Sequence, residues 1–82
     1  MAVNEDLLQR ITINPKVMVG KPVIRGTRIP VELVVRLLAQ GISESDIIRQ
    51  YPHLQLEDIR AALAYAAAVV ANEEVFPLSV KG

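Results

Sequence analysis

The apolar period of the sequence changes at Pro30, and this change limits what the chain can fold into. Before Pro30, short β-prone runs are interrupted by prolines and glycines, so we expect residues 11–13 and 22–28 to be extended. After Pro30, apolar residues recur with the three- and four-residue spacing of amphipathic helices. The pattern predicts a mainly α protein with helices near residues 30–40, 44–51 and 56–71.

Local signals mark where these helices begin and end. Pro30 suits the first turn of the first helix, and Gly41 suits the position after its last residue. Ser43 and Asp46 form a capping box in which Asp replaces the usual Glu, and Pro52 ends the second helix. A helix, a turn containing glycine, a short helix, a turn and a longer helix make up the helix-turn-helix layout.

The third helix is the most apolar part of the chain. Many of its residues are alanines, which let other helices approach closely. Helical spacing predicts that one stripe along this helix is buried. The stripe consists of Leu56, Ile59, Leu63, Ala66 and Val70.

The composition allows one small domain, because the chain has only 82 residues. It is 51% hydrophobic with a mean hydropathy of +0.31, which is high for a small monomer. This apolar surplus, together with two edge-type segments, predicts a homodimer. We assign residues 1–72 to the domain and residues 73–82 to a C-terminal tail, in which Phe76 and Leu78 are candidate partner-binding residues.

Several function classes are excluded by what the sequence lacks. It has no cysteine, and we interpret its only histidine, His53, as a turn residue. It shows no Gly-rich phosphate loop, nucleophile–base pair or metal-ligand spacing, so we expect no enzyme activity, cofactor or metal. Its N-terminus does not resemble a signal peptide, and its longest apolar stretch, residues 61–71, is about half a membrane span. We therefore expect a cytoplasmic protein that does not enter a membrane.

The charges are unevenly distributed although the formal net charge is +0. The stretch from Arg10 to Pro30 contains five basic residues and no acidic residue, whereas the second half of the chain is acidic, so one end attracts anions. Within this stretch lie the candidate binding residues Lys21, Arg25, Thr27 and Arg28. One interpretation is a basic arm that binds phosphates or a partner's carboxylates. The other is structural, with the arginines capping a helix or pairing with Glu32.

The start of the third helix occupies the place of a DNA-recognition helix in this layout. There Gln55 could read an adenine edge, and Arg60 could contact a guanine or a phosphate. Glu57 and Asp58 lie in the same turn, where they complement the helix dipole but repel phosphate. The alternative interpretation is a solvated helix face, so DNA binding and protein binding both remain open.

Five stretches of the sequence resemble the domain-of-unknown-function 433 family. The first, GKPVIRGTRIPV, is long and distinctive, and the resemblance covers residues 10–70. The stretches are residues 20–31, 37–41, 51–52, 56–59 and 61–65. The resemblance implies a homeodomain-like fold in which short strands precede the helical bundle. The family tends to have Ser or Thr where the third helix starts, and Gln55 at that position implies a weaker cap.

The resemblance also implies a function. Members are regarded as VapB-like antitoxins, small prokaryotic proteins that bind a PIN-like nuclease toxin and can also bind their own operator DNA. A basic arm carrying Arg25 and Arg28 could pair with the clustered carboxylates of such a nuclease, and Phe76 could fill a groove on it. The alternatives are a protein-interaction module without DNA binding and a stand-alone DNA-binding regulator.

Overall fold

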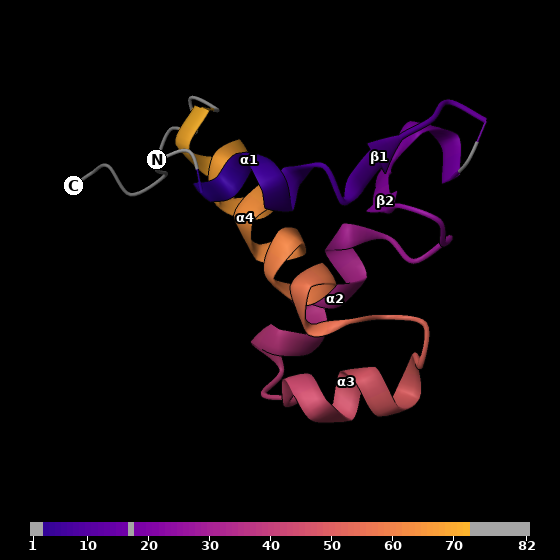
Figure 1. Cartoon of the computed structure of the whole chain (residues 1–82), viewed down its shortest axis with the longest axis vertical. Helices are drawn as coiled ribbons and strands as arrows, with labels where there is room; N and C mark the ends of the chain where they lie inside the picture. Colours follow the sequence, from indigo (N-terminus) through magenta and orange to yellow (C-terminus); the bar gives the residue numbers. More distant parts are fainter. Residues whose placement is uncertain (1–2, 17, 73–82) are drawn as a thin grey trace, which may run out of the picture.

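The computed structural model describes residues 3–16 and 18–72 of the chain (Figure 1). These residues form a mainly α structure with a short two-stranded sheet near the N-terminus, as the sequence predicts. The elements are α1 (Val3–Leu8), β1 (Ile11–Ile13), the 3-10 helix η1 (Met18–Gly20), β2 (Pro22–Ile24), α2 (Val31–Ala39), α3 (Glu44–Gln50) and α4 (Leu56–Asn72). The three predicted helices are thereby confirmed. No helix in the described ranges is long and apolar enough to cross a membrane.

Helix α1 has no counterpart in the sequence-based prediction. It spans six residues, and an isolated helix of that length is unstable in water. In the structure α1 packs along α4, and Leu7 lies against the hydrophobic core (Figure 1). Tertiary packing therefore stabilises a helix that its own sequence does not indicate.

The sheet is antiparallel and small. Ile11 lies opposite Ile24, Thr12 opposite Val23, and Ile13 opposite Pro22. Strand β2 ends at Ile24, so the prediction of extended chain through residue 28 is wrong beyond that point. The chain turns after Ile24 and comes back toward the sheet, where Pro30 forms a single bridge with Val23.

The helix boundaries follow the local signals in the sequence. Gly41 has φ +89°, and its N–H donates to Leu38 while the N–H of Ile42 donates to Leu37, which is the Schellman arrangement at the end of α2. The Ser43 hydroxyl accepts from the backbone N–H of Asp46 at 3.1 Å and caps α3. The capping box is only half formed, because the Asp46 carboxylate pairs with Arg49 instead.

The core lies where the sheet and helices α2, α3 and α4 meet. Its largest fully buried side chains include Ile24, Val34, Ile47 and Ile59. One side chain from each of four elements thus contributes to the same cluster. These four elements follow one another along the chain, and the cluster fixes how the helical bundle sits on the sheet.

The buried stripe predicted on α4 is wrong at two positions. Leu63 is 42% exposed and Val70 is 67% exposed, whereas Ala61 and Ala62 are completely buried. Small alanines face the rest of the protein because they allow the neighbouring backbone to approach. Leu63 is therefore left on the outer surface of α4, whereas Val70 borders a groove beside α2.

Candidate binding surface

The residues between β2 and α2 form a tight turn, which we call the basic turn (residues 25–28). The N–H of Thr27 donates to the carbonyl of Ile24 at 3.0 Å, and Gly26, the third residue of this turn, has φ +80°. These are the features of a type II turn, which requires positive φ at its third position. Gly26 is therefore needed for its backbone conformation, which residues with a side chain rarely adopt.

The side chain of Thr27 holds the basic turn together. Its hydroxyl donates to the carbonyl of Ile24 at 2.7 Å and accepts from the N–H of Ile29 at 2.9 Å. The N–H of Ile24 also donates to the carbonyl of Ile29 at 3.0 Å. The segment is thus an ordered turn rather than the free arm suggested by the sequence, and Thr27 is engaged in holding its shape.

The two arginines of the basic turn have different environments. The Nε of Arg25 donates to the carbonyl of Gln9 at 2.6 Å, and the backbone N–H of Arg25 donates to Arg10 at 2.7 Å. Arg25 therefore anchors the basic turn to the junction between α1 and β1. Arg28 is exposed and makes no hydrogen bond or ion pair with any residue that the structure describes. The structural interpretation thus fits Arg25, and the binding interpretation fits Arg28.

An open hollow of about 780 Å³ lies beside the basic turn. It is lined by residues 25–29 and by His53, which comes from the loop between α3 and α4. Two guanidinium groups and an imidazole therefore surround one surface depression. The sequence indicates only a turn at His53, because no pattern within a single sequence links position 53 to positions 25–28.

The start of α4 is built around Asp58. Its carboxylate accepts from Arg10 Nη1 at 2.9 Å and from the backbone N–H of Gln55 at 2.9 Å. The Asp58 side chain is only 11% exposed. Asp58 therefore caps α4 by accepting from Gln55, the residue before the helix, and its charge is balanced by Arg10. Of the two acidic residues expected to repel phosphate, only Glu57 faces solvent.

The remaining predicted site residues are dispersed. Lys21 borders a different hollow and lies 4.0 Å from Glu32, which also pairs with Arg36 at 2.7 Å. Gln55 and Arg60 are exposed on the first turns of α4. Phe76 and Leu78 lie outside the described residues. The structure therefore brings Arg25, Thr27 and Arg28 together, and Lys21 does not share their hollow.

Within residues 3–16 and 18–72, no group of three or more His, Asp or Glu residues is arranged to hold a metal ion. Buried side-chain nitrogen and oxygen atoms in this part all have hydrogen-bond partners.

These features define a helix-turn-helix-type bundle with a two-stranded sheet at its N-terminal end. The chain belongs to the family described as "Protein of unknown function (DUF433)", whose model matches residues 11–66. It is similar to the crystal structure of a DUF433 member from Anabaena variabilis, with a TM-score of 0.72 and 36% identity. That match covers 82% of this chain and 66% of the Anabaena chain.

Two further relatives are similar in sequence. The uncharacterized protein y4eO of Sinorhizobium fredii is 41% identical over 58 residues, which are 71% of this chain and 26% of that protein. An uncharacterized protein of Archaeoglobus fulgidus is 60% identical over 30 residues, which are 37% of this chain and 83% of that protein. The chain thus spans about a quarter of the Sinorhizobium protein, so the family membership carries over while any activity of the longer protein does not.

Proposed function

We propose that this protein is a non-enzymatic, antitoxin-like binding protein that neutralises a PIN-like nuclease by presenting the basic turn to acidic groups of the nuclease. The observation that supports this most is the state of Arg28. Its guanidinium is exposed on an ordered turn and has no acidic partner among the residues that the structure describes. A cation in that position is available for an anionic partner.

The order of the basic turn favours binding. The hydrogen bonds of Thr27 and the anchor through Arg25 fix the backbone before any partner arrives. A surface that is already ordered loses less conformational entropy when it binds. Arginine can also form two parallel hydrogen bonds to one carboxylate, which lysine cannot. One such desolvated contact contributes about 1.5–3 kcal/mol, or roughly ten- to hundredfold in affinity.

The outer surface of α4 favours a protein partner over DNA. Beyond Arg60 it carries the apolar side chain of Leu63, which is 42% exposed. Phosphates gain nothing from such groups, whereas a protein surface can cover them. The nuclease is therefore the first candidate partner.

Operator DNA is the second candidate, and one observation favours it. Arg10 balances the charge of Asp58, so the first turn of α4 repels phosphate less than its sequence suggests. Gln55 and Arg60 then stay exposed near the helix start, where a recognition helix contacts bases. Glu57 is the remaining acidic residue there.

A nuclease titration tests the proposal. A PIN-like nuclease encoded beside this protein is assayed on RNA while the purified chain is added in increasing amounts. We expect inhibition that is complete near a fixed stoichiometry, and no RNA cleavage by the chain alone. Full nuclease activity at saturating amounts of the chain would refute the antitoxin proposal, and RNA cleavage by the chain alone would refute its non-enzymatic character.

A further inference from the structure

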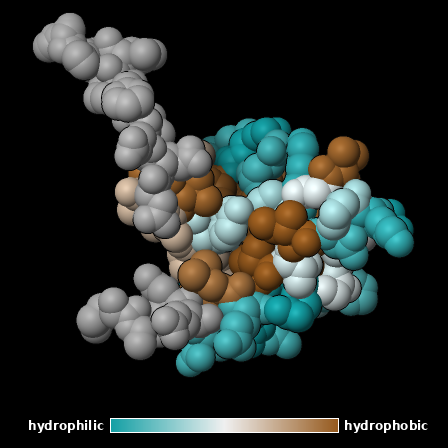
Figure 2. All heavy atoms as spheres, turned by 90° about the horizontal axis from the view of Figure 1, so that it is seen from above, coloured by the Kyte–Doolittle hydropathy of each residue, from teal (hydrophilic) through white to brown (hydrophobic). Residues whose placement is uncertain are grey.

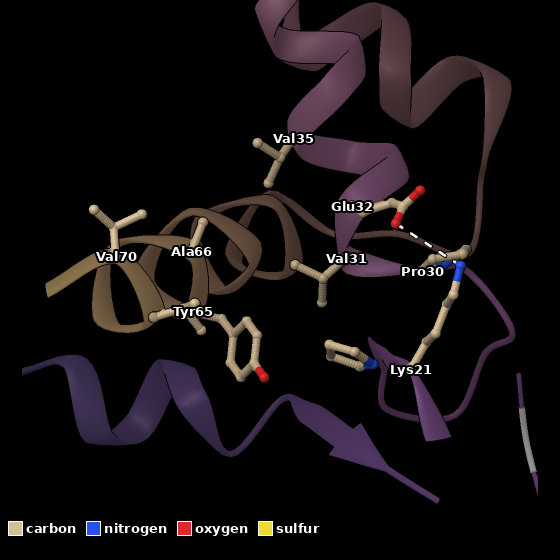
Figure 3. Close-up of a pocket in the computed structure, with 10 residues that line it drawn as sticks. Lys21, Pro30, Val31, Glu32, Val35, Tyr65, Ala66 and Val70 are labelled. Carbon is tan, nitrogen blue, oxygen red and sulfur yellow. Dashed lines mark ion pairs between the residues drawn. The ribbon is translucent and has the colours of Figure 1, made fainter. Parts of the chain in front are cut away.

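An apolar groove lies on the side of α4 that faces α2. It has a volume of about 340 Å³, enough for one or two large side chains. Figure 3 shows Val31 and Val35 of α2 on one side and Tyr65 and Ala66 of α4 on the other. Its apolar lining is contributed chiefly by Val31, Val35, Tyr65, Ala66, Val69 and Val70.

The described residues leave this groove open. Val70 is 67% exposed, and Val35, Tyr65 and Val69 are only half-buried. At one end the groove is bordered by the ion pair of Lys21 and Glu32, whose side chains are 57% and 55% exposed. Apolar residues are also visible between hydrophilic ones on the face seen from above (Figure 2). Exposed apolar surface of this kind is stabilised when a matching segment covers it.

We propose that residues 75–80 of the same chain pack into this groove, with Phe76 as the main inserted side chain. This inference is independent of the proposed function. The segment reads Val-Phe-Pro-Leu-Ser-Val and follows the last residue of α4 after only two intervening residues. It contains the only phenylalanine of the chain. An apolar segment therefore begins directly beyond the helix whose final turns line an apolar groove.

The tail is long enough to reach. Ala66 lies six residues before Asn72, or roughly 9 Å back along the axis of α4. The four residues from Asn72 to Phe76 can span about 14 Å when extended, which leaves room for a reversal at residues 73 and 74. The six residues from Asn72 to Leu78 can span about 21 Å when fully extended.

Tethering favours the chain's own tail over a second copy. A segment joined by a short linker is present at an effective concentration of about millimolar, above the usual concentration of free protein. Pro77 restricts the unbound tail and lowers the entropy lost when it binds.

A single-tryptophan probe tests the proposal in the full chain. The protein has no tryptophan, so in a Phe76→Trp variant the indole is the only such reporter. We expect its emission at shorter wavelength than in the urea-unfolded chain. We also expect quenching by acrylamide to be reduced about threefold relative to the unfolded chain, because the ring is buried.

Two matched variants locate the indole. Val70 lines the groove and is exposed enough to accept a charge without unfolding, so Val70→Glu added to Phe76→Trp should restore solvent-exposed emission. Ala67, which is exposed on the same helix outside the groove, is the control, and Ala67→Glu should leave the emission unchanged. Circular dichroism checks that both variants fold.

Three results would overturn the proposal. The first is emission of the Phe76→Trp indole that equals that of the unfolded chain. The second is a buried indole that Val70→Glu does not expose. The third is a wavelength shift that disappears on dilution, which would assign the groove to the tail of a second copy.

Discussion

Arg10 Nη1 lies 2.9 Å from a carboxylate oxygen of Asp58 and joins the residue before β1 to the first turn of α4. The same carboxylate accepts the backbone N–H of Gln55 through its other oxygen. One side chain therefore connects two distant parts of the chain and caps the longest helix.

Removing this carboxylate should destabilise the fold. We expect Asp58→Ala to lower the free energy of unfolding by about 2–3 kcal/mol, because a charged hydrogen bond and a helix cap are both lost. For a domain of this size the melting temperature should fall by about 10 °C or more. Glu57→Ala, which removes an exposed acid in the same turn, is the control and should change stability little. Equal melting temperatures of Asp58→Ala and the unmodified protein would show that the contacts of Asp58 do not stabilise the fold.

The type II turn predicts that replacing Gly26 lowers the stability of the fold. We expect Gly26→Ala to lower the free energy of unfolding by about 1–2 kcal/mol, because φ +80° is unfavourable for a residue with a Cβ. A Cβ at this position would meet no atom within 4 Å, so the cost comes from the backbone alone. Gly26→Asn should cost less, since Asn tolerates positive φ better. Urea unfolding of both variants measures the difference, and a Gly26→Ala chain as stable as the original would argue against the turn.

Features set by nearby residues could be predicted from the sequence. Gly41 at the end of α2 and Ser43 at the start of α3 act on groups within a few residues, and both were identified correctly. The composition of the basic turn was also visible in the sequence. Its shape was not, because the hydrogen bond between Ile24 and Ile29 closes a loop that alternation alone reads as a continuing strand.

Features set by distant residues could not be predicted. The pairing of Arg10 with Asp58 joins positions 48 residues apart, and His53 comes to the basic turn from another loop. The outward orientation of Leu63 was missed for a different reason. Almost every residue of α4 after Arg60 is apolar, so the period does not tell which face is buried.

The homodimer remains a prediction, and the outer surface of α4 now suggests where it would form. Leu63 is 42% exposed on that surface, and a two-fold contact there would cover it. We expect light scattering to give the mass of a dimer at high micromolar concentration and Leu63→Glu to shift it toward the monomer. Arg49→Glu on α3 serves as a surface control. A monomer mass for the unmodified chain would exclude the homodimer.

Operator binding has its own signature. If the first turn of α4 contacts DNA, binding to the upstream region of the gene should weaken steeply with added salt. Arg60→Ala should then reduce the slope of log binding constant against log salt concentration by about 1, the value of one phosphate contact. Arg36→Ala on α2 should leave this slope unchanged. A gel shift that shows no complex at low salt, with or without the nuclease, would leave protein binding as the sole candidate.

The most direct test of the central claim measures stability and affinity on the same Arg28 variants. Because Arg28 is exposed and makes no hydrogen bond or ion pair with the other described residues, Arg28→Ala should melt like the unmodified protein. Its affinity for the PIN-like nuclease in calorimetric titration should fall at least about tenfold, with Arg28→Lys in between because lysine cannot pair bidentately. Arg49→Ala, which removes another exposed arginine, should bind normally. An Arg28→Ala chain that is folded and binds the nuclease as tightly as the unmodified protein would contradict the account.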